Sequence, residues 1–361
     1  WEQRKLGEVV SVFDGTHQTP NYKNKGIMFL SVENINTLLS NKFISENEYR
    51  QRFKIKPRYL DVFMTRIGTI GKTNVITTHK PIAYYVSLAL LRPQNIQSFF
   101  LSFIIQTSKV QQDIWKRTLQ IAFPQKINKD EIGKVTLAVP LQKEQIDIEK
   151  LLLKLDKLVT LQQRKLNQLK RLKTAMLQQL FTDKNSKQPN LRFKNFRGDW
   201  EQRKLKSVVS VNSGKDYKSL EKGNIPVYGT GGYIASVSKF LSSQDAIGLG
   251  RKGTINKPYI LKAPFWTVDT LFYLTLKPEN ILTFIYSLIQ KINWLQYDES
   301  TGLPSLSKKN IENVLVSLTK LDEQQKIGKV IVKLDKFITL QQSKIDQLTI
   351  LKKYLLQKLF I

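Results

Sequence analysis

The sequence contains no cysteine and only two histidines, His17 and His79, among its 361 residues. The sequence therefore lacks the residues needed for several kinds of site: zinc sites with Cys and His ligands, disulfide frameworks, catalytic cysteines and histidine-centred triads. The longest apolar run, SFFLSFII at 98–105, is far shorter than a membrane span, and no signal peptide follows Trp1. We expect a soluble protein of the reducing cytoplasm with no membrane partner. A start at Trp rather than Met leads us to expect a few natural residues before it.

Acidic residues are also scarce, since 29 Asp and Glu stand against 58 Lys and Arg and leave a formal net charge of +29. This excess is beyond what solubility requires and indicates a polyanionic partner, with nucleic acid as the first candidate. A membrane surface would also need a basic amphipathic helix with Trp or Phe on its apolar side. A merely lysine-rich surface is the remaining alternative.

The sequence repeats itself once. WEQRKL occurs at 1–6 and again at 200–205, and further pairs follow in the same order. RIGTI (66–70) corresponds to RKGTI (251–255), RPQN (92–95) to KPEN (277–280), and KLDKLVTLQQRK (154–165) to KLDKFITLQQSK (333–344). The offset falls from 199 to 185 before Arg66, which places about 14 extra residues in the first copy. Two such long units indicate a tandem duplication rather than a solenoid.

Each copy has a variable block followed by a nearly constant block of about 40 residues. The variable blocks combine short β-rich runs, glycine-containing turns and one helix each, at about 96–116 and 281–295, and predict compact α+β domains. The linker between the copies is polar, and Phe193 and Phe196 are expected to anchor it to the next domain. The predicted boundaries are domain one at 1–143, a helix at 144–182, a linker at 183–199, domain two at 200–322 and a helix at 323–361.

The constant blocks predict two long coiled-coil helices, because apolar residues recur at alternating spacings of four and three. Both seams are interrupted at the midpoint of the helix, by Gln162 and Gln341. In an antiparallel pair these glutamines would meet across a pseudo-two-fold axis and set the register; alternatively, both lie at the edge of the seam and face water. The predicted helix-pairing residues are Leu152, Leu155, Val159, Gln162, Leu166, Ile331, Leu334, Ile338, Gln341 and Ile345.

Motifs for catalysis are weak. GLGRKG at 248–253 satisfies G-x-G-x-x-G, but the following TINKP ends in a helix breaker, so a surface β-turn is favoured over a nucleotide site. The chain has no N-P-P-F or D-P-P-Y loop of an adenine methyltransferase. Asp61 and Asp245 precede the two R-x-G-T-I turns without a nearby Glu-x-Lys, so a structural role is favoured over a nuclease site. These observations predict a binding protein with no cofactor and no metal.

Basic, amide and hydroxyl residues gather in turns at corresponding places in the two copies. Such side chains neutralise phosphates or contact base edges, although a solvated loop is the alternative for any one of them. As a set, loops at corresponding positions with different residues at their ends predict two domains that recognise different DNA sequences. The candidate DNA-binding residues are Thr16, His17, Gln18, Lys23, Arg66, Thr69, Lys72 and Lys80 in copy one, and Lys215, Tyr228, Thr230, Arg251, Lys252, Thr254, Asn256, Ser300 and Thr301 in copy two.

The repeated WEQRKL segments, the two R-x-G-T-I turns, LRFKNFRGDWEQRKL at 191–205 and the paired KLDK helices resemble the specificity subunits of Type I restriction-modification enzymes. The resemblance covers essentially the whole chain. It implies two tandem target-recognition domains that each read half of a bipartite, asymmetric double-stranded DNA site, separated by two antiparallel helices that set the spacing. It also implies docking of two methyltransferase subunits, which would carry S-adenosylmethionine, association with restriction subunits through the complex, and a role in DNA methylation and phage defence.

Two other functions remain open from the sequence. The chain could be a coiled-coil scaffold whose basic surface binds nucleic acid without sequence preference, or a self-contained nuclease. Preference for one bipartite duplex over a scrambled duplex separates the specificity subunit from the scaffold. Metal-dependent cleavage by the chain alone would identify the nuclease.

Overall fold

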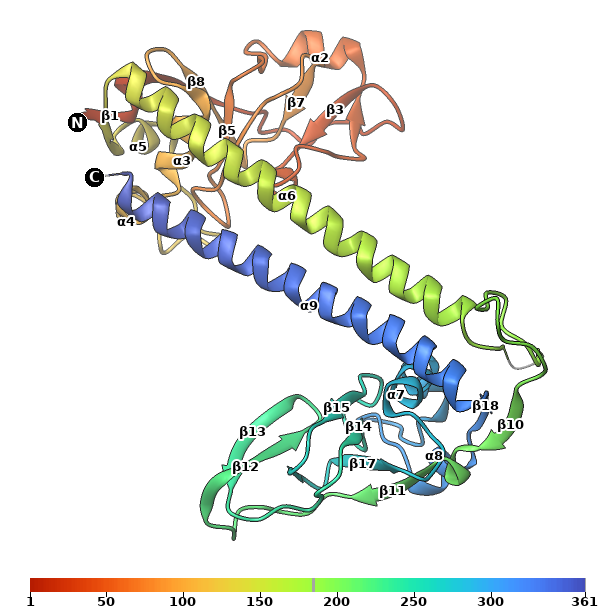
Figure 1. Cartoon of the computed structure of the whole chain (residues 1–361). Helices are drawn as coiled ribbons and strands as arrows, with labels where there is room; N and C mark the ends of the chain where they lie inside the picture. The colour runs from red at the N-terminus through yellow and green to blue at the C-terminus, as the bar shows by residue number, and fades with distance from the viewer. Residues whose placement is uncertain (184–185, 361) are drawn as a thin grey trace. The chain divides into compact units, whose positions relative to one another are not determined.

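The computed structural model describes residues 1–183 and 186–360, and it divides the chain into two compact units. The first comprises Trp1–Gln162 and Lys344–Ile361, and the second comprises Gln163–Ser343. Each unit therefore contains one variable block together with part of both long helices (Figure 1). The sequence predicted boundaries at the helix ends, whereas this division of the chain falls within the helices, after Gln162 and after Ser343.

The first unit is built around a four-stranded antiparallel sheet of order β2-β8-β5-β6. Its central strand β8 (Leu88–Pro93) is almost continuously apolar because both of its faces are covered. Ala89 and Leu91 pack in a cluster with helix α3, while Leu88 and Leu90 pack in a second cluster with the smaller sheet. The elements before the long helix are β1 (Glu2–Lys5), α1 (Leu6–Val9), β2 (Val10–Asp14), β3 (Ile27–Leu30), η1 (Val32–Asn34), β4 (Phe43–Ile44), α2 (Glu46–Arg52), β5 (Val62–Thr65), β6 (Thr73–Val75), β7 (Ile82–Tyr84), β8, α3 (Ser98–Ile105), α4 (Ser108–Lys116), α5 (Lys129–Gly133) and β9 (Thr136–Val139).

The second unit repeats this plan, which confirms the duplication and the α+β class. Its sheets have the orders β11-β17-β14-β15, β13-β12-β16 and β10-β18, which correspond to β2-β8-β5-β6, β4-β3-β7 and β1-β9. The extra residues of copy one lie where predicted, since η1 stands between β3 and β4 and α2 follows β4, whereas the equivalent β12 and β13 are joined directly as a hairpin. The elements of the second block are β10 (Glu201–Lys204), η2 (Leu205–Ser207), β11 (Val209–Ser213), β12 (Lys222–Gly229), β13 (Gly232–Val237), β14 (Ala246–Gly250), β15 (Tyr259–Leu261), β16 (Trp266–Thr267), β17 (Leu271–Leu276), α7 (Leu282–Lys291), η3 (Trp294–Tyr297), α8 (Lys308–Asn313) and β18 (Leu315–Leu318).

Two details of the sequence prediction were wrong. The single helix expected at 96–116 is two helices, because Thr107 adopts an extended conformation that starts α4 and its hydroxyl donates to the Ile104 carbonyl. Its counterpart ends at Lys291 and is followed by the short η3. The alignment of RPQN with KPEN is also shifted by two residues: the amide of Gln94 donates to Val9, and that of Lys277 donates to the equivalent Val208.

The two long helices are continuous and of equal length. Helix α6 (Gln142–Gln179) and helix α9 (Leu321–Lys358) each have 38 residues, as the heptad pattern predicted, although both begin two residues earlier than expected. In the first unit, the start of α6 and the end of α9 run side by side in opposite directions, with Lys352 Nζ 2.6 Å from Asp156 Oδ1 (Figure 1). In the second unit, Lys173 Nζ lies 2.5 Å from Asp335 Oδ1.

The predicted seam residues all avoid full exposure. Leu152, Leu155, Leu166, Ile331, Gln341 and Ile345 are buried, and Val159, Gln162, Leu334 and Ile338 are half-buried. Leu152 and Ile331 also belong to the cores of their own domains, so the seam fastens each helix to its domain as well. A glutamine layer between Gln162 and Gln341 would join the two units and stays a prediction.

An aromatic trio is repeated where the long helices meet the domains. In the first unit, Trp1 and Phe360 lie 6.0 Å apart, and Phe100 of α3 lies 5.4 Å from Phe360. In the second unit, Phe181 lies 6.1 Å from Trp200 and 5.1 Å from Phe284 of α7. Each trio thus takes its third ring from the end of the other copy's long helix.

The linker is anchored as expected, because Phe193 packs on the second core and Lys326 lies 4.9 Å from the Phe196 ring. Within the described ranges, no helix has the length and apolar character needed to cross a bilayer.

Candidate nucleic-acid interface

Two of the predicted loops of copy one attach to a single short segment after β7. The amide of Thr16 donates to Tyr84 (3.1 Å), and the amide of Val86 donates back to Thr16 (2.9 Å). The amide of Arg66 donates to Ser87 (3.0 Å). The structure therefore brings together the turn after β2 and the turn after β5, which are 50 residues apart in the sequence.

Copy two repeats this arrangement after β16. The amides of Lys215 and Arg251 donate to Thr267 and Thr270, each at 2.8 Å, and the amide of Val268 donates to Tyr228 (3.0 Å). Residues 267–270 therefore hold three segments, which are the Tyr228 hairpin, the Lys215 turn and the Arg251 turn. We call this segment, and its equivalent at 84–87 in copy one, the shared support. They form the same kind of site from different side chains.

Glycines at equivalent positions permit the close approach of the first loop. A side chain at Gly15 would meet the Tyr84 carbonyl at 2.6 Å, and one at Gly214 would meet the Val268 carbonyl at 2.0 Å. Both contacts are with backbone carbonyl groups, which cannot move aside as a flexible side chain could. Any larger residue there would push the loop off its support.

A further loop pairs with each R-x-G turn. In copy one, the amide of Gly68 donates to Gln125 (2.9 Å) and that of Ile127 donates to Arg66 (3.0 Å). In copy two, the amide of Gly253 donates to Pro304 (2.8 Å) and that of Leu306 donates to Arg251 (2.9 Å). The loops at 119–127 and 299–306 are therefore equivalent.

The sequence prediction included Ser300 and Thr301 but missed the loop of copy one. The signal was present, because the same offset of 179 that aligns the long helices also aligns 119–127 with 298–306.

Contact between Arg66 and DNA stays a prediction, and the structure shows this side chain in contacts within the chain. Its guanidinium is buried, forms an ion pair with Asp14 and donates from Nε to the Ile127 carbonyl (3.1 Å). These contacts, made by Nε and Nη1, hold the paired loops together. The residue at the position of Asp14 in copy two is Ser213, so the equivalent cation has no carboxylate there.

Arg251 accordingly has a different environment. It is half-buried, and its guanidinium carbon lies 5.6 Å from the centre of the Phe272 ring. No ion pair of Arg251 is found among residues 1–183 and 186–360. Two arginines that look equivalent in the sequence thus differ in environment: Arg66 is buried and paired with Asp14, whereas Arg251 is half-buried beside Phe272.

The remaining candidates differ in exposure and in position. Lys23 and Lys80 precede β3 and β7, whereas the shared support lies after those strands, so these two lysines are not brought to the paired loops. His17, Gln18, Lys23, Thr69, Lys72, Lys80, Lys215, Lys252, Asn256 and Thr301 are exposed, while Thr16, Tyr228, Thr230, Thr254 and Ser300 are half-buried.

Ser300 is engaged within its own loop. Its hydroxyl donates to Asp298 Oδ1 (2.9 Å), which also accepts from the amides of Ser305 (2.8 Å) and Ser300 (3.0 Å). These bonds, led by the one from the Ser305 amide, lower the pKa of Asp298. Ser300 therefore shapes the loop, and Thr301 is its more accessible neighbour.

The hairpin end of copy two carries exposed apolar groups that the prediction did not single out. Tyr233 is 64% exposed and Ile234 is 48% exposed, beside Tyr228. Burial raises the pKa of the neighbouring Tyr259, whose hydroxyl donates to the Gly229 carbonyl (2.5 Å). This bond holds the turn end of the hairpin, where β12 ends at Gly229.

The carboxylates that could suggest catalysis are held in structural contacts, as expected. Asp61 is buried, accepts from the Arg58 amide and pairs with Arg92 at 2.8 Å. Asp245 accepts from Lys262 Nζ (2.5 Å) and from the Ala263 amide (2.9 Å), and the Lys262 bond lowers its pKa. In the part of the chain that the structure describes, no three His, Cys, Asp or Glu side chains gather as metal ligands would.

The G-x-G-x-x-G string is part of the sheet and its turn. Gly248 and Gly250 lie in β14, and the following element is the strand β15 rather than a helix. Gly253 has a φ of +82° and occupies the turn. The interpretation as a β-turn is confirmed.

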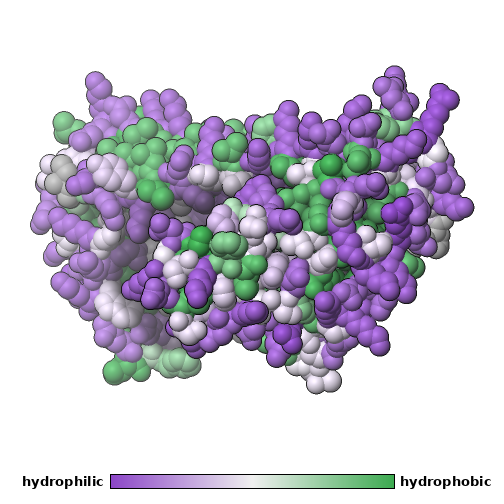
Figure 2. Space-filling model, turned by 60° about the horizontal axis from the view of Figure 1, so that its bottom comes forward, coloured by the Kyte–Doolittle hydropathy of each residue, from purple (hydrophilic) through white to green (hydrophobic). Residues whose placement is uncertain are grey.

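Hydrophilic side chains cover most of the surface in view, with apolar patches between them (Figure 2).

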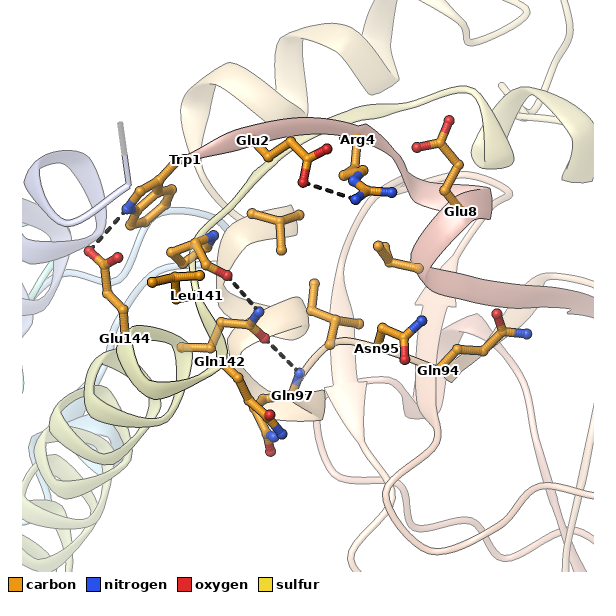
Figure 3. A pocket seen from close by; sticks show the side chains of 15 residues that line it. Trp1, Glu2, Arg4, Glu8, Gln94, Asn95, Gln97, Leu141, Gln142 and Glu144 are labelled. Atoms are coloured by element: carbon orange, nitrogen blue, oxygen red, sulfur yellow. Dashed lines mark hydrogen bonds and ion pairs between the residues drawn. The ribbon is translucent and has the colours of Figure 1, made fainter.

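A hollow of about 640 Å³ lies where the first domain meets the start of α6 (Figure 3). Trp1 Nε1 donates to Glu144 (3.0 Å) at its edge, and the buried Gln145 accepts from the Gln97 amide (3.0 Å). At the equivalent place in the second unit, the linker residue Arg192 pairs with Glu323. The hollow is thus part of the joint between domain and helix.

Comparison with known proteins agrees with this architecture. The whole chain aligns with the crystal structure of the Type I restriction-modification system S subunit from M. genitalium, with a TM-score of 0.70, 17% identity and 96% of that chain covered. It also aligns with a structure described as the structural basis underlying complex assembly and conformational transition of the type I R-M system, with a TM-score of 0.59, 12% identity and 97% of that chain covered. At such identities these likenesses show the fold alone.

A curated relative and a family model extend the comparison to sequence. The Type I restriction enzyme MjaVIII specificity subunit of Methanocaldococcus jannaschii is 30% identical over 121 residues, which are 33% of this chain and 26% of that protein. The alignment therefore spans about a quarter of the relative's length. The model of the Type I restriction modification DNA specificity domain matches residues 1–171 and again residues 197–349, and this chain belongs to that family.

Proposed function

We propose that this chain is the DNA sequence-specificity subunit of a Type I restriction-modification enzyme. Each domain reads one half of a bipartite, asymmetric duplex, and the chain has no catalytic activity of its own. The observation that carries the proposal is the repeated support: two copies of one loop scaffold present different side chains, in a chain with a net charge of +29.

Affinity and sequence specificity come from different side chains of this protein. Lys and Arg neutralise phosphates and supply most of the affinity, which therefore falls with salt. Side chains on the supported loops contact base edges and supply the choice of sequence. Arg251, Lys252 and Thr301 are the best-placed candidates in copy two, and Thr69 and Lys72 are those of copy one.

The helices supply the spacing between the half-sites. A continuous helix of 38 residues is about 57 Å long, and half-sites on one side of B-DNA lie about 34–36 Å apart for each turn. A glutamine layer at Gln162 and Gln341 and a pseudo-two-fold relation of the copies complete this proposal. Together they would let similar halves read an asymmetric site.

The helices also present apolar side chains for docking of two methyltransferase subunits. Leu161 (58% exposed) and Ile350 (68%) lie on the helices in the first unit, and Leu340 (66%) and Phe337 (45%) in the second. Those subunits would bind S-adenosylmethionine, and restriction subunits would join through them, in the cytoplasm.

The test is a binding measurement at physiological salt, with the chain assembled with its methyltransferase subunits. Genome-wide mapping of methylated adenines, with and without this chain, first identifies the target duplex. Preference for that duplex over a scrambled one by at least about a thousand-fold supports the proposal. Equal binding to both would instead favour a scaffold with non-specific nucleic-acid affinity.

A further inference from the structure

The loop at 119–127 in copy one ends in two fully exposed apolar side chains. Ile121 and Phe123 are both fully exposed to solvent. Such side chains occur singly on many surfaces, but here two lie two residues apart on one projecting tip. Leu119 and Trp115 nearby are 40% and 50% exposed.

The base of this loop is firmly held. The amide of Leu119 donates to Lys126 (2.8 Å), which closes the loop on itself, and the amide of Ile127 donates to Arg66 (3.0 Å). The Arg66 guanidinium adds a bond to the Ile127 carbonyl and the ion pair with Asp14. The tip is therefore presented on a fixed base beside the Thr69 and Lys72 turn, in the proposed DNA interface.

Comparison of the two copies argues against a protein partner at this tip. At the offset of 179 the positions in copy two are Ser300 and Gly302, and the loop there carries one exposed apolar side chain, Leu303, instead of a pair. Methyltransferase subunits that dock on both halves need features common to both copies. A feature present in only one copy belongs to what the copies read differently.

The charge around the tip favours a polyanion. No Asp or Glu occurs between Asp61 and Asp113, nor between Asp113 and Asp130, so both paired loops of copy one lack carboxylates. Lys72 and Lys126 are exposed on these two loops. These loops combine exposed lysines with exposed apolar side chains and have no carboxylates. The combination is complementary to DNA, in which charged phosphates surround a stack of apolar base faces.

We propose that Ile121 and Phe123 form an apolar wedge that inserts between base pairs in the half-site read by copy one. Apolar side chains of DNA-binding proteins enter base steps in this way, partly unstack them and kink the duplex, most readily at pyrimidine–purine steps. The wedge would make copy one selective for a deformable step, while copy two, whose loop has the single Leu303 instead of this pair, makes no such insertion. This inference rests on the proposed function.

The experiment uses the chain assembled with its methyltransferase subunits and duplexes carrying 2-aminopurine at successive positions of each half-site. Apart from the methylated positions, where the methyltransferase itself takes the base out of the stack, the wild-type complex should raise the fluorescence at one step of the copy-one half-site and at none of the copy-two half-site. Ile121→Ala/Phe123→Ala should abolish that rise and weaken binding on the order of ten-fold, as expected when one stacking contact is lost. Because both side chains are exposed, the thermal midpoint should not change.

The matched control is Leu303→Ala, an exposed apolar side chain in the equivalent loop of copy two. It should leave the copy-one fluorescence unchanged. The wedge is overturned if the double variant keeps the fluorescence signal and the affinity, or if it loses methyltransferase assembly instead. Failure of the wild-type complex to prefer its target duplex would overturn the proposed function itself, which makes the two failures distinguishable.

Discussion

Arg192 of the linker and Glu323 at the start of α9 form a two-pronged ion pair. Nε and Nη2 of the arginine each lie 2.8 Å from one carboxylate oxygen, and the bond to Glu323 raises the pKa of Arg192. Glu323 is only 1% exposed, so its charge depends on this partner. The pair ties the linker to the second unit.

Replacement of Arg192 by Ala should therefore destabilise the second unit by about 3–5 kcal/mol, since it leaves a buried carboxylate without its counter-charge. Chemical denaturation monitored by tryptophan fluorescence measures the loss. Arg203→Ala is the control, because the Arg203–Glu201 pair is exposed and solvent screening should make its loss small. Equal effects of the two substitutions would refute the structural role of Arg192.

Arg66 and Arg251 should respond oppositely to replacement by Ala. Arg66→Ala removes a buried ion pair and should lower stability by at least about 2 kcal/mol. Arg251→Ala should leave stability within about 0.5 kcal/mol and cost about 1–3 kcal/mol of DNA binding through the copy-two half-site alone. Denaturation and binding to duplexes altered in one half at a time provide both readouts. A loss spread over both halves would contradict separate readers.

Insertion of one heptad into both long helices, between Gln162 and Gln163 and between Gln342 and Ser343, should lengthen the preferred spacer. Seven residues add about 10.5 Å, which corresponds to about three base pairs at 3.4 Å each. Neither half-site should change, because the loops remain intact. Methylation mapping of the variant measures both the spacer length and the half-site sequences. An unaltered spacer would disprove the role of the helices in setting the spacing.

Leu340→Ala/Phe337→Ala should weaken methyltransferase assembly by at least about ten-fold while leaving the thermal midpoint unchanged, since both side chains are exposed. Leu166→Ala is the contrasting variant. Leu166 is buried, and its truncation should cost about 2–5 kcal/mol of stability. Analytical ultracentrifugation with the methyltransferase subunit measures assembly, and normal assembly of the double variant would exclude this docking surface.

Glu149 provides a pH-dependent prediction. Its partial burial raises the pKa of its carboxyl group, against the lowering effect of the bond from the Phe100 amide. The protonated form is therefore favoured in the folded state, and stability from this group falls as the pH rises through the ordinary and then the raised pKa. Glu149→Gln keeps an acceptor for Phe100 and should remove this fall, which denaturation at pH 4 and pH 7 would detect. An undiminished pH dependence in the variant would assign it to other groups.

Local patterns in the sequence determined a large part of this protein. The duplication, the α+β blocks, the excess of positive charge and the two helices of 38 residues all follow from repeats and periodicity, because helical spacing and strand runs are local properties of the chain. The placement of Phe193 in the second core was likewise readable from its position in a polar linker.

Only the tertiary structure decided which side chains are available. Arg66 and Arg251 occupy the same motif, yet the residue across the sheet, Asp14 or Ser213, determines whether the cation is neutralised. The pairing of the R-x-G turn with the loop that carries Ile121 and Phe123 likewise depends on backbone bonds between segments more than 50 residues apart. Such contacts arise from long-range packing, and the spacing of residues along the chain does not encode them.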